Sequence, residues 1–383
     1  MPDTERSVVV LTHYFAPAVK AGGPVQSLAA LSASELGHRV RVLAGDRDLG
    51  DTEPMPGVAR RTWTPSGAGQ VMHFDAGDVR TPWRALRTLR GLSPSHAYLN
   101  SLFGVTTGLL PLGLAKLRLL GPGRLVLAPR GQLDPGALAL SATRKRLVLR
   151  LLRALRLLDG VRWHATSDLE ARHIRNVVGN GAEVCVVPPL PPSLGRSEDG
   201  GRVRPAVPLR LLFLSRISPK KGLDTLLRAL ATVPEPVGLD VYGPSDDASY
   251  AAVCRALADQ LPGCHRVTFH GTAAHARVGQ LMQAADAFVL PTLGENFGHA
   301  IFEALSAGCP VVLTPTTPWT EAVRRGAGWL VEPGDVGGLA QVLSGLATSS
   351  PERLAATSAC ALDAATNYRD GADADAGWAR LFT

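Results

Sequence analysis

Short apolar runs alternate with stretches of helical periodicity along most of this chain. The runs are rich in Val and Leu and are bounded by Gly, Pro or polar residues, which favours buried strands. They include residues 7–13, 38–44, 209–214, 237–242 and 284–290. Residues 46–82 instead look turn-rich. Strands that alternate with helices predict parallel sheets covered by helices.

The alternation occurs twice, and a segment without periodicity separates the two series. Residues 191–208 are rich in Pro, Gly and polar residues, which is typical of a linker. The sequence therefore predicts two doubly wound, Rossmann-like α/β domains that face each other across a cleft. The first spans residues 1–190 and the second residues 209–365, and a C-terminal helix over 366–383 packs back toward the first.

Composition and charge limit the classes of protein to which this chain can belong. Hydrophobic residues make up 45% of the 383 residues and charged residues 19%, which predicts a large folded core. The net charge of +7 is spread along the chain, so nucleic-acid binding is not expected. Five cysteines without a C-x-x-C pair indicate neither a disulfide framework nor a zinc site. Because we recognise neither a secretory leader nor an apolar run long enough to span a membrane, we expect a reduced, cytoplasmic protein.

Two loops after predicted strands carry residues suited to phosphate. Gly22 and Gly23 precede a helix, where bare backbone can approach a phosphate, although an ordinary turn explains a glycine pair equally well. No G-x-G-x-x-G motif is present there, which disfavours a dinucleotide cofactor. The loop 215–222 carries Arg216 and Lys221 after a buried strand. Because Arg grips phosphate through two bonds and Lys adds compact charge, phosphate binding is favoured over a solvated basic turn.

A third loop and the helix after it, within residues 291–310, carry two glutamates with seven residues between them. Glu295 falls in the loop, and Glu303 falls in the helix among apolar neighbours. A buried carboxylate requires a partner, and two ligand hydroxyls would serve. The helix N-terminus adds free N–H groups suited to phosphate. The pattern indicates a ligand with both hydroxyls and phosphates.

These motifs resemble those of the retaining GT-B glycosyltransferases, the large family that includes bacterial mannosyltransferases and sucrose synthases. The resemblance rests on the glutamate spacing, the Glu-Asn-Phe-Gly run at 295–298 and the Lys-Gly pair at 221–222. It implies transfer of a sugar from a nucleoside-diphosphate sugar to a hydroxyl acceptor, with the anomeric configuration retained by front-face attack. Positive charge from Arg216, Lys221 and a helix dipole would meet the diphosphate, so neither a metal ion nor another cofactor is expected.

The resemblance also implies a role for each site residue. Arg216 and Lys221 would hold the diphosphate and stabilise its charge on departure, and Glu303 would bind the ribose hydroxyls. Glu295 would contact the donor sugar and act in catalysis without being a nucleophile. The donor site is expected to comprise Gly22, Gly23, Arg216, Lys221, Glu295, Asn296, Phe297, Gly298 and Glu303.

Three residues of the first domain are candidates for the acceptor side, namely His13, Lys20 and Arg130. Arg130 stands where many relatives carry a histidine near the donor sugar. This resembles a subgroup associated with exopolysaccharide or lipid-linked glycan assembly. The segment 187–189 also departs from the usual Pro-Asn-Gly at the linker. The acceptor is therefore expected to be a small molecule or a lipid-linked glycan, in bacterial glycan or natural-product biosynthesis.

The segment Arg144–Leu158 contains six basic residues and no acidic one. Arg146, Arg150 and Arg153 share one helical face. Such a helix could lie on an anionic membrane and bring the enzyme to the inner face of the bilayer, near a lipid-linked acceptor. A domain helix with one solvated basic face explains the same pattern.

Two other hypotheses stay open at this point. A nucleotide-sugar epimerase or a phosphorylase could use the same fold and the same donor residues. A non-catalytic subunit that binds a nucleotide-sugar and stabilises a partner enzyme belongs to a different class. The presence of all four charged site residues argues against the subunit, because a degenerate site could lose them.

Overall fold

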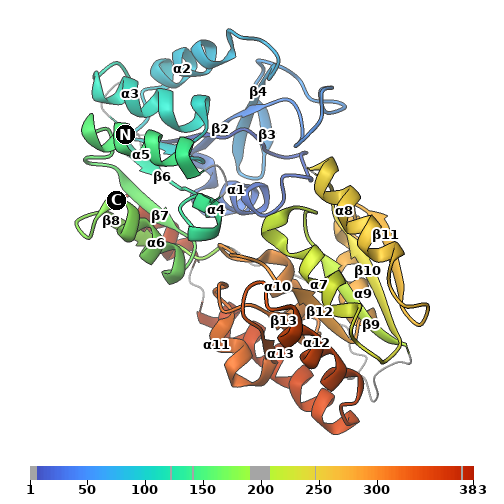
Figure 1. The fold of residues 1–383 in the computed structure, drawn as a ribbon. Helices are drawn as coiled ribbons and strands as arrows, with labels where there is room; N and C mark the ends of the chain where they lie inside the picture. The colour runs from blue at the N-terminus through green and yellow to red at the C-terminus, as the bar shows by residue number, and fades with distance from the viewer. Residues whose placement is uncertain (1–6, 121–122, 140–141, 190–207, 246, 372–373) are drawn as a thin grey trace. The chain divides into compact units, whose positions relative to one another are not determined.

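A computed structural model describes residues 7–120, 123–139, 142–189, 208–245, 247–371 and 374–383. The chain forms two compact units, shown in Figure 1: Met1–Leu190 with Asp373–Thr383, and Pro191–Ala372. Each is a parallel-sheet α/β unit, which confirms the predicted fold class. The predicted linker lies outside the described residues, except for Pro208.

The first unit is built on an eight-stranded sheet in the order β3-β4-β2-β1-β5-β6-β7-β8. All of its pairings are parallel except that of β3 with β4. The strands are β1 (Val8–Leu11), β2 (Val40–Gly45), β3 (Thr64–Ser66), β4 (Gly69–Phe74), β5 (His96–Leu99), β6 (Arg124–Leu127), β7 (Arg162–Ala165) and β8 (Glu183–Val186). The strand order reverses between β1 and β5, which is where open α/β sheets bind ligands.

Helices cover both faces of this sheet. They are α1 (Gly23–Ala33), α2 (Thr81–Leu92), α3 (Leu110–Lys116), α4 (Pro135–Ala139), α5 (Ala142–Ala154), α6 (Asp168–Val178) and α14 (Ala374–Leu381). Strand β1 shows the division, because Val8 and Val10 belong to one buried cluster and Val9 and Leu11 to another. This alternation follows from the two-residue period of a strand that is buried on both faces.

The second unit contains a six-stranded, wholly parallel sheet in the order β11-β10-β9-β12-β13-β14. The strands are β9 (Leu209–Leu214), β10 (Val237–Tyr242), β11 (Arg266–Gly271), β12 (Ala287–Leu290), β13 (Val311–Leu313) and β14 (Gly328–Leu330). This is the 3-2-1-4-5-6 order of Rossmann folds, with β9 as its first strand. The switch point therefore lies between β9 and β12.

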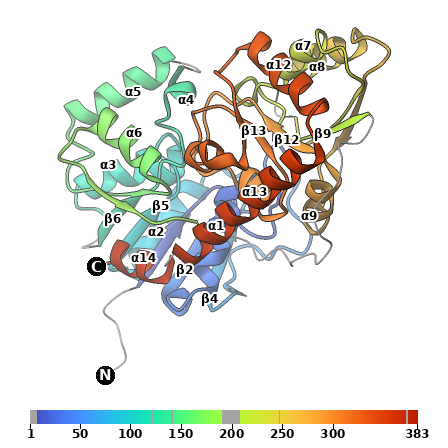
Figure 2. The same ribbon diagram turned by 90° about the horizontal axis from the view of Figure 1, so that it is seen from below.

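The helices of the second unit are α7 (Leu223–Leu230), α8 (Ala248–Asp259), α9 (His275–Ala284), α10 (His299–Ser306), α11 (Thr320–Ala322), α12 (Val336–Ala347) and α13 (Pro351–Gly371). The tail differs from the single helix expected over 366–383. Helix α13 ends at Gly371 in the second unit, and α14 begins at Ala374 and packs on the sheet of the first (Figure 2).

Candidate functional site

The loops that follow β9 and β12 meet at the switch point of the second unit. The two strands are parallel neighbours, so their carboxyl ends lie at the same edge of the sheet. The backbone N–H of Leu293 and the hydroxyl of Thr292 both donate to the carbonyl oxygen of Lys220, at 2.8 and 3.0 Å. These bonds fix the loop that carries Lys221 against the loop that carries Glu295.

Glycine residues allow these loops to approach each other closely. Gly222 has a φ of 72°, and a Cβ atom there would lie 2.2 Å from the carbonyl oxygen of Pro291. On the other side of β9, a Cβ atom on Gly243 would lie 1.9 Å from the carbonyl oxygen of Ser215. Any side chain at either position would separate the loops. This contact explains why a glycine follows Lys221.

Lys221 and Glu295 form an ion pair between the two loops. Their side chains are only 11% and 13% exposed. Burial opposes ionisation of Glu295, but the charge of Lys221, with further help from Lys220 and Arg216, outweighs burial and lowers the pKa of Glu295. Glu295 is therefore a carboxylate at neutral pH.

Arg216 lies in the same loop and is exposed. The loop is held against the end of β10, because the N–H of Ser215 donates to Tyr242 and that of Ile217 to Pro244. Three cationic side chains, at positions 216, 220 and 221, thus belong to one loop at the carboxyl edge of the sheet. The structure brings Arg216, Lys221 and Glu295 together. The contacts of the two cations with a diphosphate, and of Glu295 with a donor sugar, stay predictions.

Glu303 is buried in α10 and is only 4% exposed. Its neighbours on the helix are fully buried and apolar, namely Ile301, Phe302, Ala304 and Leu305. Burial raises the pKa of Glu303 to about 7. The Nδ1 atom of His275, the first residue of α9, lies 3.7 Å from Oε1 of Glu303. No motif in the sequence singles out His275.

Phe297 anchors the loop between β12 and α10. Its ring lies against those of Phe302, Trp319 and Tyr368, with centroids 5.4 to 6.0 Å apart. The carbonyl oxygen of Phe297 accepts a hydrogen bond of 2.6 Å from Nε1 of Trp319. Because this side chain is buried, any contribution to a donor site comes from the backbone around Phe297.

The remaining donor candidates lie at helix starts or in a loop. Gly298 has a φ of 78° and precedes α10, and Asn296 is half-buried in the loop before it. In the first unit, Gly22 has a φ of 69° and precedes α1, in which Gly23 is the first residue. A Cβ atom on Gly22 would meet nothing within 4 Å, so backbone conformation rather than crowding favours glycine there.

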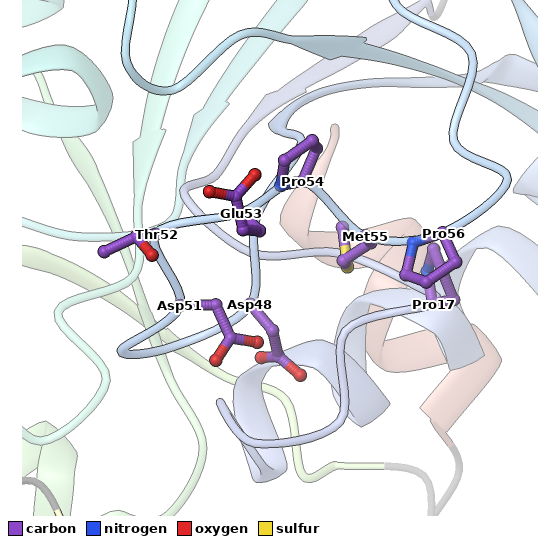
Figure 3. A pocket seen from close by; sticks show the side chains of 8 residues that line it. All are labelled: Pro17, Asp48, Asp51, Thr52, Glu53, Pro54, Met55 and Pro56. Atoms are coloured by element: carbon purple, nitrogen blue, oxygen red, sulfur yellow. The ribbon is translucent and has the colours of Figure 1, made fainter.

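Lys20 is tied to the loop after β2. Its Nζ atom lies 2.5 Å from Asp51, and its backbone N–H donates to Asp48 at 2.9 Å. Burial opposes ionisation of Asp48. Hydrogen bonds from backbone N–H groups, of which that of Lys20 has the largest effect, outweigh burial and lower the pKa of Asp48. Both carboxylates project to the same side of a hollow of about 530 Å³ (Figure 3). The hollow is lined by Pro17, Asp48, Asp51, Thr52, Glu53, Pro54, Met55 and Pro56.

His13 follows β1 at the switch point of the first unit. Its side chain is exposed and lines a second hollow, of about 480 Å³, together with Thr12, Tyr14 and Thr107. Gly104 packs against the ring, because a Cβ atom there would lie 2.7 Å from Nε2 of His13.

Arg130 connects the ends of β5 and β6. Its Nε donates to Oδ1 of Asn100 at 2.7 Å, and a terminal nitrogen donates to the hydroxyl of Tyr98 at 2.9 Å. Asn100 in turn donates to Thr12 at 3.1 Å. Arg130 therefore directs at least two of its N–H groups to protein atoms and holds the loops of this edge together.

The second unit is similar in sequence to a known family of proteins. Residues 208–349 match the family described as Glycosyl transferases group 1. The chain is 37% identical over 141 residues to a D-inositol 3-phosphate glycosyltransferase of Mycobacterium sp. (strain KMS), which covers 36% of this chain and 32% of that protein. The corresponding enzyme of Mycobacterium bovis is 34% identical over 190 residues, which covers 47% and 39%. The matches thus span about a third of the length of these curated relatives.

Solved structures resemble almost the whole chain. HepE from Anabaena, in complex with UDP and glucose, has a TM-score of 0.72 at 18% identity and covers 98% of this chain and 99% of that one. Sucrose-phosphate synthase from Thermosynechococcus elongatus has a TM-score of 0.64 at 20% identity and covers 96% and 99%. The chain therefore has the GT-B glycosyltransferase fold, and its second unit matches the group 1 glycosyl transferases in sequence.

Proposed function

We propose that this protein is a retaining glycosyltransferase that moves a sugar from a nucleoside-diphosphate sugar to a hydroxyl acceptor, in bacterial glycan or natural-product biosynthesis. One observation carries the proposal: the loops after β9 and β12 are joined by the Lys221–Glu295 pair at a switch point, with Arg216 in the first loop and Glu303 in the helix after the second. The fold neighbour HepE, solved with UDP and glucose, supports the same ligand class.

In this proposal the cations bind the diphosphate. Arg216 offers a planar set of donors that fits two phosphate oxygens. Lys221 has three N–H donors, of which Glu295 accepts one, so the ammonium group can also serve phosphate oxygens. A charge-assisted hydrogen bond contributes about 1.5–3 kcal/mol. Glu303 would accept hydrogen bonds from the two ribose hydroxyls, which act as the polar partners of its buried carboxyl group.

The proposed reaction step needs no nucleophile from the protein. The acceptor oxygen forms a bond to the anomeric carbon on the face from which the diphosphate leaves. The bond between that carbon and the phosphate oxygen breaks, and the acceptor proton passes to the leaving phosphate oxygen. Arg216 and Lys221 stabilise the negative charge that develops there. Glu295, held by Lys221, orients the donor sugar.

The same cations lead us to propose that transfer does not depend on a divalent ion. Arg216 and Lys221, with Lys220 beside them, supply positive charge where a metal would otherwise offset the diphosphate. Transfer that persists in excess EDTA and is not increased by Mg²⁺ or Mn²⁺ would agree with this assignment. Loss of transfer in EDTA with recovery on metal addition would contradict it.

The first unit favours an acceptor that donates hydrogen bonds. The hollow beside Lys20 has three carboxylates and no basic side chain among the residues that line it. Asp48 and Asp51 already accept bonds from Lys20, and their remaining acceptor capacity suits hydroxyl or amino groups of a ligand. We therefore propose a hydroxyl-rich acceptor, either a small molecule or a glycan on a lipid carrier.

A panel of nucleotide-sugars tests the proposal in two stages. A donor that binds the folded protein raises its unfolding temperature by mass action. With that donor and a panel of hydroxyl acceptors, NMR of the product then reports the configuration of the new linkage. The proposal requires a product with the anomeric configuration of the donor, and an inverted linkage would contradict it.

The same experiment separates the alternatives. An epimerase would change the sugar or release free nucleotide without an acceptor. A phosphorylase would require inorganic phosphate for turnover. Donor binding with no turnover across the acceptor panel would favour a non-catalytic subunit. Failure of every nucleotide-sugar to shift unfolding would contradict the donor site itself.

A further inference from the structure

We propose that the outer face of α5 is a membrane-binding surface that recognises anionic lipid headgroups and inserts leucine side chains among the acyl chains. The proposal rests on residues 143–156, which we call the α5 face. It does not depend on the chemistry proposed for the second unit, because all the residues that carry it belong to the first.

An apolar stripe runs along the α5 face. Leu147, Leu151 and Leu155 are 57%, 52% and 60% exposed, and they recur every four residues. Leu155 lies just beyond the helix end, but its N–H donates to the carbonyl oxygen of Leu151 at 2.9 Å, which continues the helical spacing. Residues four apart on a helix lie on the same side. The three leucines are thus one continuous patch, whereas exposed leucines are otherwise scattered singly on soluble proteins.

The opposite face of α5 packs against the core of the first unit. Leu149 and Leu152 are buried in the core of the first unit. Lys145 points inward as well, since its Nζ atom donates to the carbonyl oxygen of Ala137 and lies 6.0 Å from the centroid of the Phe103 ring. The exposed leucines are therefore not needed to hold α5 on the sheet.

Arginines border the leucine stripe. Arg144, Arg146, Arg150 and Arg153 are all exposed, and residues 142–158 include no acidic side chain. Arg156 is excluded from the argument because it pairs with Asp159 at 2.7 Å. Leucines that project outward between guanidinium groups match a bilayer surface, where apolar side chains enter the acyl region and arginines meet lipid phosphates.

Charge favours an anionic membrane over a second copy of the chain. Two α5 faces in contact would bring eight arginines together without an acidic partner on either helix, which like-charge repulsion opposes. The binding would be peripheral, because none of the helices in the described part of the chain has the length and hydropathy to cross a bilayer. Figure 2 shows α5 at the periphery of the first unit.

Vesicle co-sedimentation of the full chain tests the proposal. The probes are vesicles of phosphatidylcholine alone and vesicles in which phosphatidylglycerol replaces about a third of it. We expect binding to the anionic vesicles at low salt, weaker binding as salt rises, and at least tenfold weaker binding to the neutral vesicles. No sedimentation with anionic vesicles at low salt would overturn the proposal.

Paired substitutions then separate the two components. Leu147→Ser with Leu151→Ser keeps all charges, and Arg146→Gln with Arg150→Gln keeps the leucines. We expect each pair to weaken vesicle binding at least tenfold. Matched controls on the second unit are Val253→Ser with Leu362→Ser, at side chains 48% and 45% exposed, and Arg277→Gln with Arg353→Gln, at exposed arginines. Both controls should bind as the wild type does.

Unfolding temperature reports whether each variant is folded, and all eight positions are exposed. Equal binding by the wild type and both α5 pairs would overturn the proposal. So would a concentration-dependent dimer, seen by light scattering, that the Leu147→Ser and Leu151→Ser pair abolishes while vesicle binding is absent. That result would identify the α5 face as a contact between copies of the chain.

Discussion

Lys221 and Glu295 lie 74 residues apart in the sequence and form a nearly buried ion pair where the strand order of the second unit reverses. The pair joins the loop that carries the proposed diphosphate-binding residues to the loop that precedes α10. Because each charge is withdrawn from water, each depends on the other for compensation. The pair therefore has a structural role whether or not a donor is bound.

The first prediction concerns the coupling of these two charges. Lys221→Met leaves the Glu295 carboxylate buried without its main partner, which should lower the free energy of unfolding by about 3–5 kcal/mol. Adding Glu295→Gln removes the stranded charge, so the double variant should lose less than the sum of the two single losses. A double-mutant cycle in urea measures this coupling.

The exposed pair of Glu321 and Arg325 is the control for this cycle. Its side chains are 61% and 76% exposed, so its coupling should be below about 1 kcal/mol. Additive losses at Lys221 and Glu295 would contradict the role given to the buried pair. Since the folded pKa of Glu295 is lowered, the stability from its ionisation is complete above the ordinary carboxyl pKa and is lost as pH falls through the folded value.

Glu303 should make the free protein less stable as pH rises. Its folded pKa of about 7 exceeds the ordinary value of 4.5, so the folded protein binds this proton more tightly than the unfolded chain. The free energy of unfolding then declines between these two pH values, by about 3 kcal/mol in total. Glu303→Gln removes the titration and should stabilise the protein at pH 8 while changing little near pH 4.5.

The same substitution should weaken donor binding, because the amide offers one acceptor oxygen in place of two. Urea unfolding at pH 5 and pH 8 measures the first effect, and calorimetric titration with the donor measures the second. Glu332→Gln, at an exposed glutamate of the second unit, should change neither. An equal effect of Glu303→Gln on stability at both pH values would show that the carboxyl group does not titrate as described.

Arg216 should contribute to donor affinity and not to stability. Its side chain is exposed, and loss of a charge-assisted bond corresponds to about tenfold to hundredfold weaker binding. Arg216→Ala is therefore expected to weaken donor binding by that factor with an unchanged unfolding temperature. Arg228→Ala, at an exposed arginine in the last turn of α7, should bind the donor normally. Wild-type affinity in Arg216→Ala would remove this residue from the site.

Gly222 should be more sensitive to substitution than other glycines with the same backbone conformation. Gly222→Ala meets both a positive φ and a backbone atom 2.2 Å away, whereas Gly334 has a φ of 79° with nothing within 4 Å. Gly334→Ala should destabilise by about 1–2 kcal/mol, from conformation alone. Gly222→Ala should cost more and should also displace Lys221. Equal losses of stability, with donor affinity intact in both, would contradict the packing role of Gly222.

The sequence predicted the strands of both units well where Val, Leu and Phe are concentrated, as in β9 and β12. It missed β4, because residues 46–82 look turn-rich and Gly69, Gln70, Met72 and His73 have little intrinsic preference for strands. That strand forms because Val71 pairs with Val42 in the neighbouring strand β2 and is buried there. Tertiary context, rather than local preference, decides its conformation.

The sequence predicted individual candidate residues of the site, but it did not predict which of them contact one another. Burial of Glu303 followed from its apolar neighbours, and the cations at 216 and 221 followed from their place after a strand. The ion pair of Lys221 with Glu295 depends on β9 being the neighbour of β12, and local periodicity does not encode strand order. His275 approaches Glu303 for the same reason, because the packing of α9 against α10 is a tertiary contact.

The C-terminal helix α14 should be required for the stability of the first unit. Trp378 is fully buried there, with its ring edge-on to His164 at a centroid distance of 5.0 Å and tilted against Tyr98 at 6.2 Å. Nε2 of His164 donates to the carbonyl oxygen of Val187, so Nδ1 accepts from the hydroxyl of Tyr98 at 2.6 Å. Burial, with the nearby charge of Arg130, lowers the pKa of His164 to about 3 and keeps the ring neutral.

Trp378→Ala removes the ring that covers this hydrogen-bonded pair and should lower the free energy of unfolding of the first unit by about 3–5 kcal/mol. Trp378→Phe should cost less, because it keeps an aromatic ring and removes an Nε1–H that has no hydrogen-bond partner among the described residues. Trp83→Ala, at a tryptophan of the same unit that is 62% exposed, should change stability little. Hydrogen exchange of the β5 and β7 amides measures the loss within the first unit. Unchanged protection of those amides in Trp378→Ala would show that α14 is dispensable for this core. Faster exchange confined to the first unit would instead show that α14, although it lies near the end of the sequence, completes the fold of the first unit.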